Sequence, residues 1–196
     1  MFHGQRCRAK KYPWSFGNLL FAAVGSLLIA AIAHADTSPW LLVDTAARSL
    51  SVIQDGVIRE QFNNIAYGSG GVADVRLRGE RKTPRGEFRI AWVNEKSPFR
   101  LFFGFDYPNI DYSKKALQSG RIDWDTYVDI LLASARQRVP PQDTILGGHI
   151  GIHGLGRANP DIHQEFNWTE GCIALTNEQI ERLSHWVRIG TRVVIH

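Results

Sequence analysis

The sequence predicts a mainly β domain that carries one inserted helix and a second helix directly after a cysteine. Short runs of β-branched and apolar residues, separated by turn residues, fill much of the chain between positions 40 and 93. One segment near position 130 has apolar residues at helical spacing, and another begins with a helix-capping signature at Thr176. The sequence contains no internal repeat and no low-complexity linker.

The first half of the chain is predicted to form a β-meander followed by a further strand. Asp55-Gly56 is a strong two-residue hairpin signal, because both residue types tolerate the positive φ angles of such a turn. The glycine-rich residues 68–71 interrupt the strand pattern, and residues 79–86 are predicted to be a polar, basic loop. The predicted strands are Trp40–Asp44, Ser49–Gln54, Val57–Asn63 and Glu87–Val93.

The middle of the chain is expected to hold aromatic loops and one amphipathic helix. The helix is predicted from Trp124 to about Arg138, with Asp123 as its N-cap and Pro140-Pro141 ending it. Its apolar stripe is expected to pack into the core, and consists of Tyr127, Val128, Leu131, Leu132 and Ala135. Burial is also the favoured interpretation for the aromatic residues of the preceding loops, Phe102, Phe103, Phe105 and Tyr107.

The last third of the chain places a histidine at the end of a strand and a cysteine before a helix. Residues 149–153 alternate with period two, so His149, Gly151 and His153 are expected to share one face. Thr176 and Gln179 form a capping box for a helix through about residue 187, and a final strand is predicted over residues 191–196. Cys172 is therefore expected in the turn just ahead of this helix.

Residues 1–35 show the three parts of an export signal in order. A basic segment precedes an apolar run over residues 19–32, and Ala33-His34-Ala35 fits the small-x-small cleavage pattern. The apolar run is shorter than the roughly 18 to 20 residues expected of a membrane-spanning helix. We expect a cleaved signal peptide and a periplasmic protein; the alternative is an uncleaved inner-membrane anchor with the rest of the chain facing the periplasm.

The remainder, residues 36–196, has a length suited to one domain, and we expect a monomer that contacts the membrane only through an uncleaved leader. The leader holds four of the 23 Lys and Arg residues and none of the 19 Asp and Glu residues. The formal net charge of +4 therefore comes from the leader, and the rest of the chain is close to neutral. This balance argues against nucleic-acid binding.

Cys172 and His153 are the candidate catalytic residues. Cys7 lies in the leader, so Cys172 has no disulfide partner within residues 36–196. A lone cysteine is by itself more often a buried hydrophobe, but this one follows Thr-Glu-Gly and has His153 upstream. Because the thiolate is the nucleophilic form, pairing with the imidazole is expected to lower the pKa of the thiol. The pattern indicates a cysteine acyl-transfer enzyme.

The turn around Cys172 offers backbone donors as well. The N–H groups of Glu170, Gly171 and Cys172 are candidates for an oxyanion hole, which stabilises charge that develops on an attacked carbonyl oxygen. The side chains of Glu165 and Glu170 are expected to be solvated loop charges.

Two other groups of side chains have alternative interpretations. His149, His153, His163 and Cys172 are the residue types of a zinc site, but an extended strand would place His149 and His153 about 13 Å apart. For His149 and His163 a structural or surface role is favoured. A basic run is interpreted as a solvated loop face, with recognition of substrate carboxylates as the alternative; it comprises Arg76, Arg78, Arg81, Lys82 and Arg85.

The order of these residues resembles the L,D-transpeptidase catalytic domain, also called the YkuD domain. In that family a His-Gly or His-x pair is followed, after about fifteen residues, by Ser/Thr-x-Gly-Cys; here residues 154–168 separate His153 from Thr169. Residues 82–88, Lys-Thr-Pro-Arg-Gly-Glu-Phe, are similar to the family's Lys-Thr-Pro-x-Gly-x-Phe segment. The resemblance spans most of residues 39–196 and implies a β-sandwich or barrel-like fold. Residues 168–177 are similar to the exported YafK-type branch.

The resemblance implies acyl transfer on peptidoglycan stem peptides. Cys172 would attack the carbonyl at the L-centre of a meso-diaminopimelyl–D-alanine bond, and D-alanine would leave. The thioester would then pass to an amine of another stem, to a protein lysine or to water. His153 is implied as general acid and base, with a backbone carbonyl near Gly154 orienting its ring. No metal or other cofactor is required, and Trp168, Thr169 and Arg85 are candidate substrate contacts.

Two departures from the family pattern concern these substrate contacts. Many members carry a histidine before the Gly-Cys pair and an arginine or other polar residue two positions after the cysteine, whereas this chain has Glu170 and Ala174. The alternative functions are an L,D-carboxypeptidase or amidase that hydrolyses the same class of bond, and an inactive cell-wall binding module. Papain-like enzymes and sortases fit less well, because their order or spacing of cysteine and histidine differs.

Overall fold

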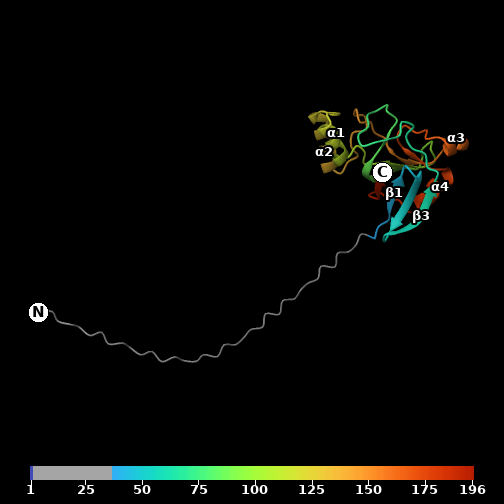
Figure 1. Ribbon diagram of the computed structural model, residues 1–196, viewed down its shortest axis with the longest axis horizontal. Coiled ribbons are helices and arrows are strands. Elements are labelled where there is room, and N and C mark those ends of the chain that lie inside the picture. Colours follow the sequence, from blue (N-terminus) through green and yellow to red (C-terminus); the bar gives the residue numbers. More distant parts are fainter. Residues whose placement is uncertain (2–36) are drawn as a thin grey trace, which may run out of the picture. The chain divides into compact units, whose positions relative to one another are not determined.

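The structure is a computed structural model that describes Met1 and residues 37–196 (Figure 1). The predicted signal segment, residues 1–35, lies outside the described residues apart from Met1, and its cleavage stays a prediction. No helix among the described residues is long and apolar enough to span a membrane.

Eight strands form one mixed sheet, in the order β3-β2-β1-β10-β6-β7-β8-β9. The mainly β fold class is therefore confirmed. The strands of this sheet are β1 (Trp40–Asp44), β2 (Ser49–Gln54), β3 (Val57–Asn63), β6 (Gly86–Asn94), β7 (Phe102–Phe105), β8 (Gly151–His153), β9 (Ile173–Ala174) and β10 (Arg192–Ile195). Two short strands, β4 (Val72–Ala73) and β5 (Thr83–Pro84), pair in parallel beside it.

The predicted meander is confirmed, since β1, β2 and β3 pair antiparallel in sequence order. Asp55 and Gly56 join β2 to β3 with φ angles of 55° and 73°, which is the geometry that the Asp-Gly dipeptide favours. The C-terminal strand β10 completes the sheet by pairing parallel to β1 and antiparallel to β6. This pairing makes the first and last strands of the described domain neighbours.

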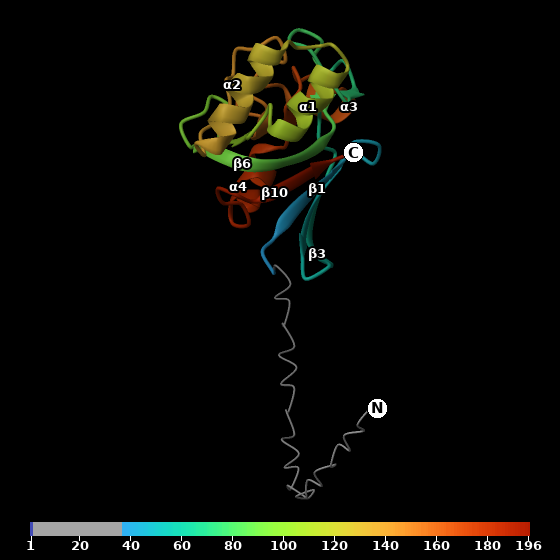
Figure 2. The ribbon, with the colours of Figure 1, turned by 90° about the vertical axis from the view of Figure 1, so that its left-hand side faces the viewer.

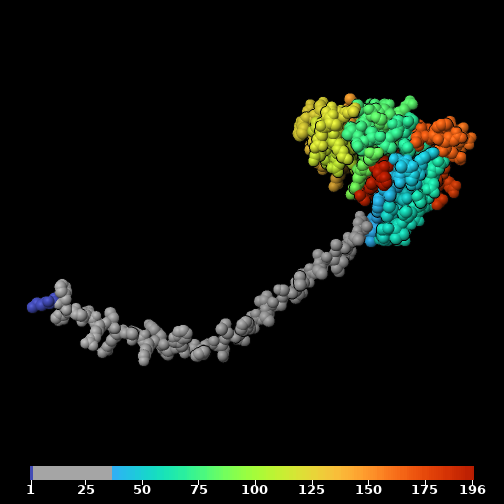
Figure 3. All heavy atoms as spheres, in the orientation of Figure 1, coloured from blue at the N-terminus to red at the C-terminus, as the bar shows by residue number. Residues whose placement is uncertain are grey.

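Four helices accompany the sheet: α1 (Ile110–Gln118), α2 (Trp124–Ala135), α3 (Pro160–Glu165) and α4 (Asn177–Ser184). The expectation of a single inserted helix is wrong, because α1 forms where aromatic loops were predicted. The Asn109 side chain caps α1 by accepting a hydrogen bond from the Tyr112 amide. Figure 2 shows α1 and α2 beside β6, and in Figure 3 this pair forms one edge of the folded domain.

The apolar stripe predicted for α2 packs into the core only in part, because Tyr127 lies against the core while other members of the stripe are exposed. Only Ile130 of this helix is buried, while Leu131 and Leu132 are 37% and 43% exposed. The helical spacing and the Asp123 cap are both confirmed, but α1 covers only part of the apolar face. The helix also ends at Ala135, before the predicted Arg138.

The aromatic residues around position 104 are buried as predicted, but the expected loop is wrong there, because the segment pairs with β6 and β8 as a strand. All four are buried, and three of them belong to strand β7: Phe102, Phe103, Phe105 and Tyr107. A side chain at Gly104 would collide with the Trp92 ring at 2.1 Å, so this glycine lets the indole lie across the strand. The Trp92 ring in turn stacks on Phe102 with centroids 4.8 Å apart. Strand β7 thus connects the core to β8, which carries His153.

Candidate active site

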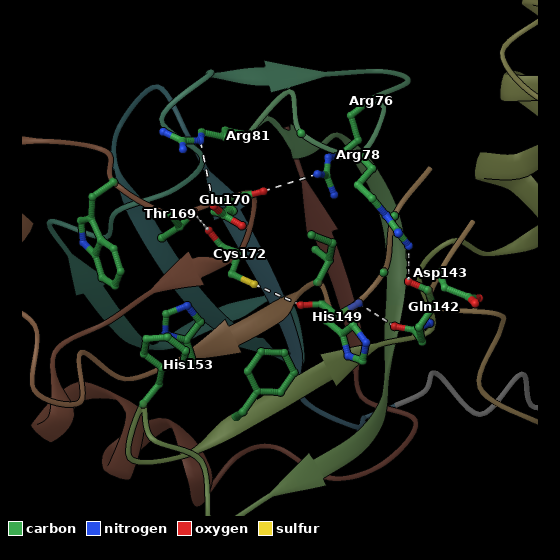
Figure 4. A pocket seen from close by; sticks show the side chains of 17 residues that line it. Arg76, Arg78, Arg81, Gln142, Asp143, His149, His153, Thr169, Glu170 and Cys172 are labelled. Carbon is green, nitrogen blue, oxygen red and sulfur yellow. Dashed lines mark hydrogen bonds and ion pairs between the residues drawn. The ribbon is translucent and has the colours of Figure 1, made fainter. Parts of the chain in front are cut away.

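Cys172 and His153 open into the same pocket, which has a volume of about 870 Å³ (Figure 4). His153 is the last residue of β8, and Cys172 immediately precedes β9. Strands β8 and β9 are parallel neighbours, with His153 in register with Ala174. Their pairing is what brings two residues 19 positions apart in the sequence to one site.

The His153 ring is held in one orientation. It is buried, and its Nδ1 lies 2.6 Å from the Gly154 carbonyl oxygen. Because a carbonyl can only accept, Nδ1 carries the proton and Nε2 keeps a free lone pair. The Phe99 ring packs against the imidazole with centroids 4.5 Å apart, and Phe102 lies nearly parallel to it at 6.1 Å. The expected orienting carbonyl near Gly154 is therefore present.

Burial lowers the pKa of His153 below its usual value, although the hydrogen bond to Gly154 opposes this effect. A buried, neutral imidazole with its Nε2 free is in the form that a general base requires.

Glycine is required on both sides of the site by close packing. A side chain at Gly154 would lie 2.8 Å from the Phe99 carbonyl oxygen. Gly171 has a φ of +130°, and a side chain there would lie 2.7 Å from the Lys82 carbonyl oxygen. The Lys-Thr-Pro segment thus packs directly against the turn that carries Cys172.

A short hydrogen-bond chain fixes that turn. The Thr169 hydroxyl donates to the Cys172 carbonyl at 2.7 Å and accepts from the Gly171 amide at 3.1 Å. The buried Thr83 hydroxyl donates to the Gly171 carbonyl at 3.0 Å and accepts from the Gly68 amide at 2.9 Å. Two threonine side chains therefore hold the backbone of the turn that carries Cys172.

One of the three expected oxyanion donors is already engaged. The Gly171 amide donates to Thr169, so the expectation that it would bind a substrate oxygen is wrong in this conformation. The amides of Glu170 and Cys172 remain candidates for this role. The Glu170 side chain is solvated as expected, 4.0 Å from Arg81 in an exposed ion pair.

The thiol of Cys172 does not pair with the imidazole in this conformation. It donates to the carbonyl oxygen of His149 at 3.3 Å, as the dashed line in Figure 4 shows. Cys172 is half-buried, but the protein atoms packed around its sulfur exclude enough water to raise the pKa of the thiol to about 11, although a backbone hydrogen bond and the charge of Arg76 oppose this. The expectation of a lowered thiol pKa is therefore wrong for this conformation, and the resting pair is a neutral thiol and a neutral imidazole.

Comparison with known families then establishes the relationship. Residues 38–195 match the YkuD family, the L,D-transpeptidase catalytic domain. The chain belongs to this family. The match does not identify a YafK-type branch. No match was found among curated proteins.

Solved structures with the same fold cover most of this chain. Pgp2 of Campylobacter jejuni, described as a helical cell shape determining protein, is 21% identical with a TM-score of 0.54, over 81% of this chain and 47% of Pgp2. Bd1075 of Bdellovibrio bacteriovorus is 19% identical with a TM-score of 0.50, over 82% of this chain and 48% of Bd1075. The chain therefore spans about half the length of these two proteins, and at such identities the likeness concerns the fold.

Of the predicted substrate contacts in this YkuD domain, Trp168 lines the pocket and its ring meets His153 edge-on at 6.0 Å. Thr169 also lines the pocket, but its hydroxyl is committed to the turn, so its role is to position Cys172. Arg85 lies outside the pocket in an exposed ion pair with Asp74. The prediction that Arg85 contacts substrate is therefore wrong for this structure.

Sequence reasoning missed several residues of the pocket, among them Gln142, Asp143 and the buried Arg76. Arg76 was interpreted as part of a solvated loop face, yet it is only 4% exposed and lines the pocket together with Arg78 and Arg81. A basic residue in a polar loop predicts exposure, and no local signal in the sequence distinguishes Arg76 from its exposed neighbours.

The other two candidate histidines differ in position, since His149 lines the pocket and His163 lies outside it. His149 is exposed with a φ of 55°, so it lies outside strand β8 and does not share a face with His153 as expected. His163 is buried, and its Nδ1 accepts a hydrogen bond from the Trp168 indole at 3.3 Å. Among the residues that the structure describes, no three His, Cys, Asp or Glu side chains are grouped as a metal site needs.

These buried imidazoles predict a loss of stability in acid. Burial lowers the pKa of His153, and burial together with the Arg48 charge lowers the pKa of His163. An unfolded histidine has a pKa of about 6.5 and takes up a proton more readily, so stability is complete above that pH and falls as the pH drops below it. We expect the melting temperature to fall from pH 7 to pH 5, and His163→Gln to reduce this slope.

Thermal unfolding followed by circular dichroism at several pH values checks this expectation. The matched control is His185→Gln, because His185 is exposed and should leave the slope unchanged. An equal slope in the wild type and in His163→Gln would contradict the prediction.

Proposed function

We propose that this chain is an exported cysteine acyltransferase that acts on peptidoglycan stem peptides. The observation that carries the proposal is the joint position of Cys172 and His153 in one pocket, with the His153 ring held so that Nε2 is free. Membership of the L,D-transpeptidase family supports the substrate class. Pgp2 is described as a cell-shape protein, and we extend an effect on cell shape to this chain as part of the proposal.

The reaction proceeds in two steps. Sγ of Cys172 attacks the carbonyl at the L-centre of the meso-diaminopimelyl–D-alanine bond while Nε2 of His153 accepts the thiol proton. The carbon–nitrogen bond then breaks, His153 returns that proton to the leaving amine, and D-alanine departs from a thioester. An amine of a second stem, a protein lysine or water then attacks the thioester carbonyl while His153 accepts its proton. The carbon–sulfur bond breaks, and His153 returns the proton to the sulfur, which regenerates the Cys172 thiol.

Turnover requires the thiol to turn away from the His149 carbonyl before it can transfer its proton to His153. The backbone amides of Glu170 and Cys172 are the proposed donors to the oxyanion. We also propose the YafK-type branch on residues 168–177 and a periplasmic location on residues 1–35. The N-terminal residue of the exported protein, identified by mass spectrometry, distinguishes a cleaved leader from an anchor.

Mass spectrometry of purified disaccharide tetrapeptides, incubated with the protein beside Cys172→Ala, tests the proposal. We expect loss of D-alanine with the wild type only. Crosslinked dimers between two diaminopimelate residues would indicate transfer, and tripeptides would indicate hydrolysis. If wild type and Cys172→Ala both leave every stem-peptide substrate intact while both bind it, the acyltransferase proposal fails and a binding module is favoured.

A further inference from the structure

Arg76 is a buried cation with unused hydrogen-bonding capacity. The residue is 4% exposed, and its Nε and Nη1 have no hydrogen-bond partner. Its Nη2 makes a long hydrogen bond of 3.4 Å to the Glu170 carbonyl, and its Cζ lies 6.0 Å from the centre of the Tyr107 ring. Within residues 37–196, no carboxylate lies within 4.0 Å of its guanidinium nitrogens.

A buried guanidinium without a full set of hydrogen bonds destabilises the folded protein unless a ligand supplies the missing partners. A guanidinium stays protonated at any accessible pH, and a buried charge is normally paired with an acid or fully hydrogen-bonded. The two neighbouring arginines differ from Arg76 in having partners of their own. Arg78 donates to the Gln142 carbonyl, and Arg81 lies beside Glu170 at the rim of the pocket. The Arg76 side chain is one of those that line the pocket containing Cys172, so a ligand in that pocket would lie beside its guanidinium.

We propose that Arg76 binds a free carboxylate on the acyl half of the substrate, the half that becomes attached to Cys172. The planar guanidinium can hold a carboxylate with two parallel hydrogen bonds, either from Nη1 and Nη2 or from Nε and Nη2. A substrate carboxylate on either edge would satisfy one of the two unpartnered nitrogens and replace the long Nη2 bond to the Glu170 carbonyl. This inference rests on the proposed function and names the group by which the pocket selects its substrate.

The position of Arg76 indicates which half of the substrate it meets. Figure 4 shows Arg76 and His153 on opposite sides of Cys172. Because His153 must protonate the leaving amine, the leaving D-alanine lies on the His153 side. The acyl chain therefore extends from the attacked carbonyl toward Arg76.

Ala174, two positions after Cys172, cannot bind a substrate carboxylate in place of Arg76. Ala174 is fully buried in β9, where its backbone pairs with Ala66 and offers the pocket no charged group. Arg76 approaches from a different part of the chain, between β4 and β5, and its backbone amide is fixed by a 2.7 Å hydrogen bond to the Tyr112 hydroxyl.

The acyl half of a stem tetrapeptide carries two free carboxylates, one on D-glutamate and one at the D-centre of diaminopimelate. The test uses the tetrapeptide and three analogues, each with one carboxylate converted to an amide: either of these two, or that of the leaving D-alanine. Turnover is measured with the wild type, Arg76→Gln and Arg76→Lys. Dissociation constants are measured in the Cys172→Ala background, with and without Arg76→Gln.

We expect Arg76→Gln to weaken tetrapeptide binding and kcat/KM by about 10- to 100-fold, the range for a charge-assisted pair. Amidation of one of the two acyl-half carboxylates should lower kcat/KM of the wild type by a similar factor and leave kcat/KM of Arg76→Gln almost unchanged. The analogue that shows this difference identifies the carboxylate that Arg76 binds. Arg76→Lys should recover part of the loss. The matched control is Arg85→Gln, because Arg85 is exposed and outside the pocket, and it should behave as the wild type.

A structural role predicts different results. If Arg76 only supported the fold, Arg76→Gln would lower the melting temperature and reduce turnover equally for all four peptides, and the inference would be overturned. Removing an unpaired buried charge should instead leave the melting temperature unchanged or raise it. The inference would also be overturned if amidation of the leaving D-alanine lowered kcat/KM for the wild type but not for Arg76→Gln. That result would place Arg76 beside the leaving half of the substrate.

The two proposals fail separately. If the wild type turns over the tetrapeptide, but Arg76→Gln binds the four peptides with the same affinities as the protein with Arg76, only the assignment of the carboxylate site fails. If no peptide is turned over but Cys172→Ala binds the tetrapeptide in an Arg76-dependent way, the carboxylate site stands and the acyltransferase proposal fails. Absence of both turnover and binding overturns both.

Discussion

His153→Gln is expected to lower the rate of D-alanine release by about 10²- to 10⁴-fold, the usual contribution of a general acid and base. The ring is buried with Nδ1 bonded to the Gly154 carbonyl, so Nε2 is the only nitrogen available for proton transfer. A glutamine amide donates hydrogen bonds but does not take up a proton from the thiol. Steady-state kinetics on the tetrapeptide provide the measurement.

The pH dependence of kcat/KM tests the same role. Burial lowers the pKa of His153, and the base must be neutral, so activity should persist below pH 6.5 and disappear only when the imidazole takes up a proton. The matched control is His185→Gln, since His185 is exposed on the far end of α4. Retention of more than about a tenth of wild-type kcat/KM by a folded His153→Gln would contradict the assignment.

Alkylation of Cys172 by iodoacetamide at pH 7 should be about 100-fold slower than alkylation of an ordinary cysteine. A thiol with a pKa of about 11 is ionised at pH 7 to only about one part in 10⁴, whereas an ordinary thiol with a pKa of about 9 is ionised to about one part in 10². The first physical cause of the raised pKa is the exclusion of water from the sulfur, and the negative charge of Glu170 adds to it. Donation of the thiol proton to the His149 carbonyl favours the protonated form as well. The rate should keep rising with pH toward 11.

Mass spectrometry of the alkylated protein over a pH series measures this rate. In the absence of substrate, His153→Gln should alkylate as slowly as the wild type at pH 7, because the resting thiol donates to His149 rather than to the imidazole. A fast reaction at pH 7 that reaches a plateau below pH 8 and is lost in His153→Gln would indicate a thiolate–imidazolium pair instead. The sequence alone predicted a lowered thiol pKa and hence a fast reaction, whereas the structure predicts a raised pKa and a slow one. The alkylation rate therefore distinguishes the two predictions.

Features that depend on neighbouring residues were predictable from the sequence. Asp55-Gly56 closes the first hairpin because these residues accept positive φ, and Thr176 with Gln179 forms a complete capping box at α4. The order His153, Gly154, then Thr-x-Gly-Cys identified the two candidate catalytic residues, since the strand and the turn that carry them are themselves short local motifs. The fold class followed from the same local patterns.

Features that depend on residues far apart in the chain were decided only by the tertiary structure. The sequence did not show that α2 would leave Leu131 and Leu132 exposed, because that depends on how much of its face α1 covers. Arg76 and Arg85 belong to one basic run, yet packing against Tyr107 and the Glu170 carbonyl buries the first, while Asp74 holds the second at the surface. The thiol pKa also depends on such packing: the His149 carbonyl that accepts the Cys172 proton is 23 positions away, and burial is a property of the whole fold.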